Sequence, residues 1–277
     1  MTDEILRKVQ LKQLEMAKEV KRVCELIDID YFLDSGTLLG AIRHNGFIPW
    51  DDDLDIGMTR NNYEKFLEEA PNVLQDKYFL QTWYSDKHYG LAFAKLRMKN
   101  TVYIEAASSN SQAHNEIYID IFPYDKYPDC RKKKVWQGKR YELIRRCILR
   151  KNGYEPWVMS KNIIDFLRKR IIYIPIDLVM LLRSRENWIQ YYQQVCTAFN
   201  NEDSQYLYAQ GTSKYGKWVM PKKCFQNYIL HKFEDTTFLI PKEYDLYLIC
   251  AYGEYMKLPP GNMRYNKHKI IKVDLGR

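Results

Sequence analysis

The stretch YFLDSGTLLGAIRHNGFIPWDDDLDIGMTRNNY, residues 31–63, contains the densest cluster of acidic residues in the chain. Four carboxylates fall within residues 51–55, and apolar residues bracket them. Because side chains alternate on a strand, Asp53 and Asp55 are expected on one face, with Leu54 and Ile56 in the core on the other. Two half-buried carboxylates side by side are tolerable when a divalent cation lies between them, and hard oxygen ligands suit Mg²⁺ or Mn²⁺.

Two other interpretations of the acidic cluster compete with a metal site. An acidic surface turn is the plainest alternative, although Leu54 and Ile56 fit a strand better than a loop. A calcium-binding EF-hand loop starting at Asp51 would need Gly at its sixth position and Glu at its twelfth, where the chain has Ile56 and Asn62. The EF-hand alternative is therefore excluded.

Two further predicted strands add charged groups. In residues 117–122 the isoleucines form one face and leave Asp120 on the other, where a carboxylate is costly unless it is paired. Asp120 can join a metal site, or only form an ion pair with a neighbour. In residues 91–98, Lys95 and Arg97 share one face and can hold phosphate oxygens, unless that face is simply solvated.

A candidate anion site precedes the acidic cluster. Ser35, Gly36 and Thr37 open a predicted helix, whose N-terminal N–H groups attract anions, and Gly lets the backbone approach a phosphate closely. Alone this signal is weak. Together with three aspartates and a Lys/Arg pair, it describes a metal-dependent site for phosphoryl or nucleotidyl transfer.

Outward from this stretch, the pattern predicts a chain of mixed α and β structure. An amphipathic helix is expected over residues 3–27, and a second helix over residues 61–69. Strands are expected around the acidic cluster, over residues 78–83 and 102–106, and over residues 117–122, where Pro123 should end the strand. Residues 128–200 are helix-like and basic with a break at Pro175, and short strands follow from Tyr206.

Composition limits the class of protein. With 277 residues, 46% of them hydrophobic and 28% charged, the chain can bury a sizeable core, and a disordered or collagen-like protein is excluded. The longest nearly apolar run, residues 171–182, is well short of the ~20 residues that span a bilayer. The six cysteines form no Cys-x-x-Cys pair, and no signal sequence is recognisable, so a cytoplasmic protein with reduced cysteines is expected.

At this point the residues resemble a known family. The block over residues 31–63 is similar to the signature of the LicD phosphotransferases, which include the fukutin-related group. Further matching features lie along nearly the whole chain: Lys95-Leu96-Arg97 with Thr101, Ile119-Asp120-Ile121-Phe122-Pro123, Tyr252-Gly253-Glu254-Tyr255-Met256-Lys257-Leu258-Pro259-Pro260, and His268.

The resemblance implies an α+β fold of the nucleotidyltransferase type, like DNA polymerase beta, with a mixed sheet and a helical basic insertion. It implies one catalytic domain over residues 1–277. Its parts would be a nucleotidyltransferase-like core over residues 1–128, a helical basic subdomain over residues 129–200 and a C-terminal part over residues 201–277 that packs back on the core. The family's metal aspartates match Asp53, Asp55 and Asp120, and its phosphate turn matches Gly36 and Thr37.

The activity implied is transfer of a phosphorylated alcohol, phosphocholine above all, from a CDP-linked donor such as CDP-choline to a glycan hydroxyl. The acceptor would be teichoic acid, lipopolysaccharide or a capsule precursor, and CMP would leave. Mg²⁺ on the three aspartates would neutralise the donor diphosphate, with Lys95 and Arg97 holding its oxygens. Asp51, Asp52 or Asp120 could be the base. Aromatic faces suit choline, and five candidates lie near the motifs: Trp50, Tyr118, Tyr124, Tyr252 and Tyr255.

Two other functions compete with this one. A true nucleotidyltransferase would use an NTP and release pyrophosphate. A basic binding module for glycan or nucleic acid would need no catalytic site, but clustered carboxylates repel phosphates, so no nucleic-acid partner is expected.

The net charge of +8 is unevenly distributed. Residues 131–185 hold 16 Lys or Arg against 4 Asp or Glu, a net of +12, which leaves −4 on the rest of the chain. Within them the apolar run 171–182 is flanked by basic residues, a composition that suits an anionic membrane surface at the inner face of the membrane, where lipid-linked glycans occur. The alternative is a solvated helix that covers a buried apolar face.

Overall fold

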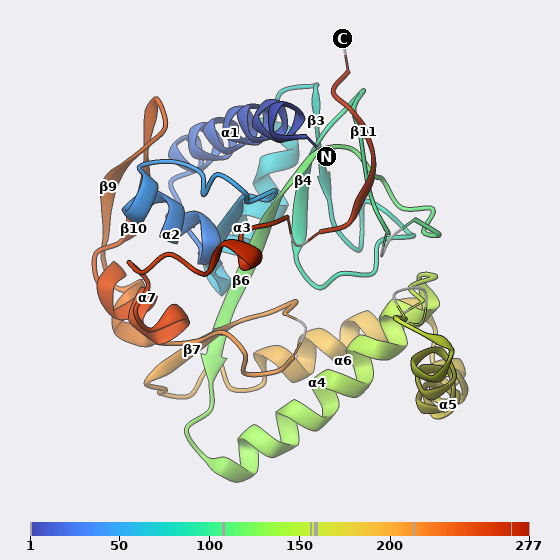
Figure 1. Cartoon of the computed structure of the whole chain (residues 1–277). Coiled ribbons are helices and arrows are strands. Elements are labelled where there is room, and N and C mark those ends of the chain that lie inside the picture. Colours follow the sequence, from blue (N-terminus) through green and yellow to red (C-terminus); the bar gives the residue numbers. More distant parts are fainter. Residues whose placement is uncertain are drawn as a thin grey trace.

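The computed structural model describes residues 2–106, 109–155, 157, 160–212, 214–266 and 268–276. Its N-terminal half contains α1 (Asp3–Leu26), β1 (Phe32–Leu33), α2 (Ser35–His44), β2 (Asp55–Thr59), α3 (Arg60–Glu69), β3 (Tyr78–Gln81), β4 (Ala94–Met98), β5 (Val102–Glu105) and β6 (Tyr118–Tyr127). The rest contains α4 (Arg131–Lys151), α5 (Ile163–Val179), α6 (Arg185–Thr197), β7 (Tyr206–Ala209), β8 (Val219–Pro221), β9 (Tyr228–Phe233), β10 (Thr236–Pro241), α7 (Tyr244–Tyr252) and β11 (Ile270–Asp274) (Figure 1).

A mixed sheet forms the centre of the molecule, which confirms the predicted α+β class. Among the described residues it has seven strands. Five of them follow the order β1-β2-β6-β4-β3, β7 pairs with β6, and β8 pairs with β7. β2 and β6 run parallel, and the other pairs in this sheet are antiparallel. Two small two-stranded sheets, β9 with β10 and β5 with β11, lie beside it.

The apolar faces of the central strands pack in the main core as the alternation predicts. Leu54 and Ile56 have no exposed surface, and neither do the isoleucines of the 117–122 segment. α1 packs along the sheet as predicted, and it buries an apolar stripe that begins at Leu6 and includes Val20. β2 begins only at Asp55, so Asp53 lies in the irregular segment before the strand rather than within it.

Two prolines do not interrupt their elements, contrary to the prediction. β6 continues through Pro123 because one edge of β6 changes partner there, from β4 to β7, and the missing N–H breaks no ladder bond. α5 continues through Pro175. Pro175 and Ile171 are both exposed, so water can satisfy the Ile171 carbonyl that a helical N–H would otherwise bond.

Helices α4, α5 and α6 form the helical basic segment, and α4 and α6 share a second hydrophobic cluster that includes Tyr141, Trp188 and Tyr192. None of the described helices combines the length and apolar character needed to cross a membrane. Helix α7 was not expected among the C-terminal strands. Its run of apolar residues is too short for periodicity to distinguish a helix from a strand.

Candidate active site

The acidic segment is held by buried glutamines of α1. Gln10 Nε2 donates a hydrogen bond to the carbonyl of Asp51 at 2.8 Å, and Gln13 Nε2 donates to the carbonyl of Asp52 at 3.0 Å. Tyr103 adds a hydrogen bond from its hydroxyl to the same Asp52 carbonyl at 3.2 Å. Both glutamines are buried, so α1 fixes the backbone of the acidic segment from the core side. The sequence predicted an amphipathic helix here and gave no sign that it would hold the acidic segment.

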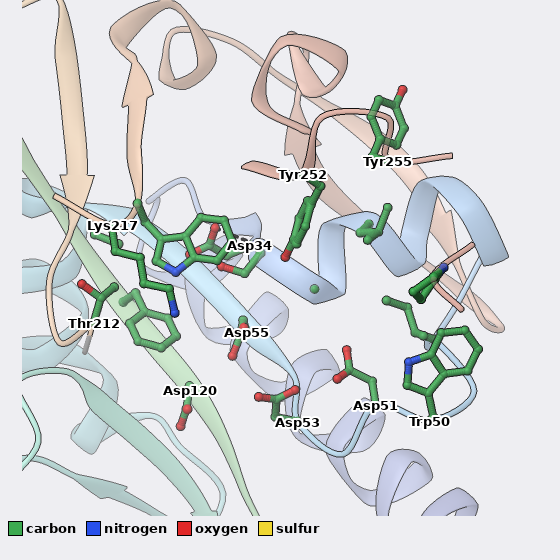
Figure 2. A pocket seen from close by; sticks show the side chains of 18 of the residues that line it. Asp34, Trp50, Asp51, Asp53, Asp55, Asp120, Thr212, Lys217, Tyr252 and Tyr255 are labelled. Carbon is green, nitrogen blue, oxygen red and sulfur yellow. Dashed lines mark hydrogen bonds between the residues drawn. The ribbon is translucent and has the colours of Figure 1, made fainter. Parts of the chain in front are cut away.

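Three carboxylates meet at one cavity, as the sequence predicts for Asp53, Asp55 and Asp120. Asp55 begins β2 and lies opposite Asp120 in the parallel pairing with β6, while Asp53 comes two residues earlier. All three line a cavity of about 710 Å³, and Figure 2 shows them directed into the same space. Burial raises the pKa of each carboxyl, and the neighbouring carboxylates raise the pKa of Asp55 further.

By donor type these carboxylates suit a divalent cation, although the three do not form a group whose ligand atoms all lie within 4.8 Å of one another in the described part of the chain. Three half-buried or buried carboxylates repel one another, and a hard cation between them would relieve that repulsion. Carboxylate oxygens alone, without thiolates, favour Mg²⁺ or Mn²⁺ over softer metals.

His268 adds positive charge to the acidic wall of the cavity. Its Nδ1 lies 3.0 Å from Asp52 Oδ1 and 3.8 Å from Asp53 Oδ2. The hydrogen bond to Asp52 raises the pKa of His268 to about 9, although burial opposes the shift. Asp52, Asp53 and His268 also bring one ligand atom each within 4.8 Å of one another. In the sequence, His268 was noted only as a matching feature of the family. The structure places it at the cavity.

The predicted phosphate turn divides into two parts. Ser35 and Gly36, at the start of α2, line the cavity. A Cβ on Gly36 would lie 2.9 Å from Asp51 Oδ2, so a larger residue here would displace the Asp51 carboxylate. Thr37 is buried, and its Oγ1 accepts a hydrogen bond from the Asp55 N–H at 2.8 Å. Thr37 therefore positions the backbone of Asp55.

Lys95 and Arg97 share one face of β4, but the structure gives them different surroundings. Lys95 lies opposite Asp120 in register, and its Nζ is 2.7 Å from Asp120 Oδ1 and 3.2 Å from the Tyr118 ring centre. Arg97 donates to Gln81 Oε1 and to the Glu116 carbonyl, both at 2.6 Å. Lys95 thus reaches the site through Asp120, and Arg97 is held in a hydrogen-bond network beside it.

Other cations line the cavity instead. They are Arg43, Lys217 and Lys257, and the C-terminal third of the chain supplies two of them. Figure 2 shows Lys217 across the cavity from the aspartates. Lys217 stands in no motif of the sequence, and Lys257 was noted there only as part of the matching family feature over residues 252–260.

Aromatic side chains form much of the remaining wall. Of the five aromatic candidates, Trp50, Tyr252 and Tyr255 line the cavity, and Trp218, which the sequence did not single out, packs edge to face on Tyr252 with ring centres 5.6 Å apart. Tyr118 and Tyr124 are buried in the core. The Tyr124 hydroxyl lies 2.8 Å from Asp34 Oδ1, at the N-cap of α2, and burial raises the pKa of Asp34.

Comparison with known proteins gives relatives over the whole chain. The family described as "LicD/FKTN/FKRP, nucleotidyltransferase domain" matches residues 28–154. The lipopolysaccharide cholinephosphotransferase LicD of Haemophilus influenzae is 32% identical over 260 residues, 92% of each chain. Ribitol 5-phosphate transferase FKRP of Homo sapiens is 27% identical over 129 residues, 47% of this chain and 23% of FKRP. With this similarity along nearly its full length and the family signature in its N-terminal half, the chain belongs to the LicD family.

Proposed function

We propose that this protein is an enzyme that transfers phosphocholine from CDP-choline to a hydroxyl of a cell-surface glycan and releases CMP. The observation that carries the proposal is the convergence of Asp53, Asp55 and Asp120 on one cavity whose other walls are aromatic and cationic. The relatives support the same class of reaction, since LicD and FKRP are named as transferases of cholinephosphate and ribitol 5-phosphate. We further propose that the sheet around these aspartates is of the nucleotidyltransferase type.

Asp53, Asp55 and Asp120 would hold Mg²⁺, with Mn²⁺ as the alternative. The ion, when bound, supplies charge neutralisation for the diphosphate of the donor. Lys95 keeps the Asp120 carboxylate in place through their 2.7 Å ion pair. The N-terminus of α2 at Ser35 presents backbone N–H groups of the kind that bind phosphates.

The reaction is a substitution at the phosphorus that carries choline. The acceptor hydroxyl oxygen forms a bond to that phosphorus, the bond from phosphorus to the bridging oxygen breaks, and CMP leaves with the bonding electrons. The hydroxyl proton passes to a carboxylate. We assign this base to Asp51, because it lines the cavity, whereas Asp52 does not line it and Asp120 is one of the proposed metal ligands.

Charge that develops on the leaving CMP must be offset by cations that reach the cavity. Lys217, Lys257 and Arg43 fill this role in the proposal, because all three line it. The opposite end of the donor is a quaternary ammonium group, which binds best over aromatic faces. The Trp218–Tyr252 pair offers such a surface, and it favours choline over the uncharged ribitol or glycerol.

A donor screen tests the proposal. The purified chain would be incubated with Mg²⁺, a glycan acceptor and CDP-choline, CDP-ribitol or CDP-glycerol in turn, and CMP release would be measured. We expect CDP-choline to be preferred, EDTA to stop the reaction and Mg²⁺ to restore it. Release of pyrophosphate from an NTP, with no CMP from any CDP-alcohol, would identify a nucleotidyltransferase instead.

Variants test the carboxylates. Asp53→Asn and Asp55→Asn should each lower the transfer rate by about 100-fold or more, because each removes charge at the centre of the site. Asp203→Asn is the matched control, since the Asp203 side chain is 82% exposed and, among the described residues, forms an ion pair only with Lys222. Near-normal transfer by Asp55→Asn would show that the metal assignment is wrong.

A further inference from the structure

Helix α5 and the turn after it, residues 180–182, expose an apolar face. The side chains of Ile164, Ile171 and Leu178 are 74%, 66% and 64% exposed, and Leu182 is 76% exposed. Ile164, Ile171 and Leu178 are spaced seven residues apart, which places them on one side of the helix. In α5 itself, of which every residue is described, Ile176 is the one buried side chain.

The alternative expectation, a solvated helix that covers a buried apolar face, accounts for the inner side of α5 but not for this exposed apolar face. α5 packs on the neighbouring helices through its other side, where Tyr173, Ile176 and Met180 join the second hydrophobic cluster. Figure 1 shows α5 at the edge of the molecule, beside the end of α4. Singly exposed apolar residues are ordinary, but a contiguous apolar stripe of this kind marks an interaction surface.

The charges around the stripe indicate what it contacts. Arg168, Arg170 and Arg183 flank it, and the helical segment 131–185 carries a net +12 from 16 basic and 4 acidic residues. Two copies of this face would repel each other, which disfavours a dimer formed through it. A surface that is both apolar and negatively charged complements the stripe, and an anionic phospholipid bilayer has that combination.

We propose that α5 and residues 180–182 lie in the interface of an anionic phospholipid bilayer, with the apolar stripe toward the acyl chains and the flanking arginines at the headgroup phosphates. The helix lies on the membrane and does not cross it. The inference is independent of the proposed reaction, because it rests only on the helical segment.

Vesicle sedimentation of the full chain tests this proposal. One set of vesicles would contain phosphatidylcholine alone, and the other would contain phosphatidylcholine and phosphatidylglycerol in equal parts. We expect binding to the anionic vesicles at low salt, weakening as salt is added, and little binding to phosphatidylcholine alone. Absence of binding to anionic vesicles at low salt, or equal binding to both sets, would overturn the proposal.

Variants locate the contact. Ile171→Glu with Leu178→Glu should lower the partition coefficient more than about tenfold, and Arg168→Gln with Arg170→Gln by about fivefold for each arginine. Leu230→Glu is the matched control, because Leu230 is 62% exposed on β9 and should not affect binding. Circular dichroism would confirm that each variant is folded.

Two outcomes would contradict the location. Unchanged vesicle binding by the Ile171→Glu and Leu178→Glu variant would place the contact elsewhere. A dimer in sedimentation velocity that this variant dissociates, with no vesicle binding by the original chain, would make the face an interface between copies. Because no donor or acceptor is present in these measurements, they succeed or fail separately from the transfer assay.

Discussion

Lys95 gives the sharpest test of how the site is built. Its side chain is 5% exposed, and its Nζ lies 2.7 Å from Asp120 Oδ1. Asp120 lies opposite Asp55 in the parallel pair, so Lys95 is in direct contact with one member of a group of buried or half-buried carboxylates. Lys95→Met keeps most of the side-chain volume and removes the charge. Breaking a buried ion pair from one side costs about 3–5 kcal/mol, a large part of a typical stability of about 5–15 kcal/mol.

The second variant separates charge from packing. Lys95→Met combined with Asp120→Asn leaves no buried charge without its partner, so it should recover most of the lost free energy of unfolding. Mg²⁺ should also stabilise the Lys95→Met chain more than the original chain, because the ion would supply the positive charge that the variant lacks.

Urea unfolding in EDTA, and then in Mg²⁺, measures these differences. Lys222→Met is the control for a surface pair, since Lys222 and Asp203 are 42% and 82% exposed, and it should cost less than about 1 kcal/mol. A loss below about 1 kcal/mol for Lys95→Met would refute the reasoning, because a buried pair must cost more than an exposed one. So would a double variant that is no more stable than the single one.

Three further predictions concern other parts of the molecule. Trp218→Ala should raise KM for CDP-choline about tenfold and leave KM for CDP-glycerol nearly unchanged in steady-state kinetics, because only choline carries a cation for the aromatic wall. Gly57→Ala would place a Cβ 2.3 Å from the Phe32 ring, so urea unfolding should show a loss of about 1–3 kcal/mol or more. The hydrogen bonds from Arg7 lower the pKa of Glu234 below its usual 4.5. The original chain should therefore exceed Glu234→Gln in stability by up to about 1 kcal/mol above pH 4.5, and lose this advantage as the pH falls through the lowered pKa.

Local patterns predicted the parts of the site that depend on one strand at a time. Alternation placed Leu54 and Ile56 in the core, and it placed Asp120 opposite the isoleucine face of β6. What it could not supply is register between strands, which depends on pairing across the whole sheet. Lys95 and Arg97 are therefore equivalent in the sequence. Only the β4–β6 register places Lys95 opposite Asp120 and Arg97 opposite Tyr118.

Contacts between distant segments could not be predicted from the sequence, because they too depend on how the whole chain folds. Gln10 and Gln13 look like polar residues of an amphipathic helix, yet each donates to a carbonyl of the acidic segment about 40 residues away. Lys217 and Trp218 reach the cavity from a loop that carries no recognisable motif. Only the family resemblance pointed to the C-terminal segment, through residues 252–260 and His268.

Asp120 and Asp125, two aspartates of β6, differ in the groups that surround their carboxylates. Asp125 has no exposed surface, and its carboxylate accepts hydrogen bonds from Arg60, Asn200 and Gln210, so its charge is compensated within the fold. Asp120, five residues earlier, has Lys95 beside it, but it also faces Asp55 across the parallel pair. The residue type does not distinguish the two, although their odd spacing places them on opposite faces of β6. A fold that only had to stabilise Asp120 would surround it as it surrounds Asp125, whereas the further carboxylates gathered around Asp120 at a cavity are what the proposed Mg²⁺ site requires.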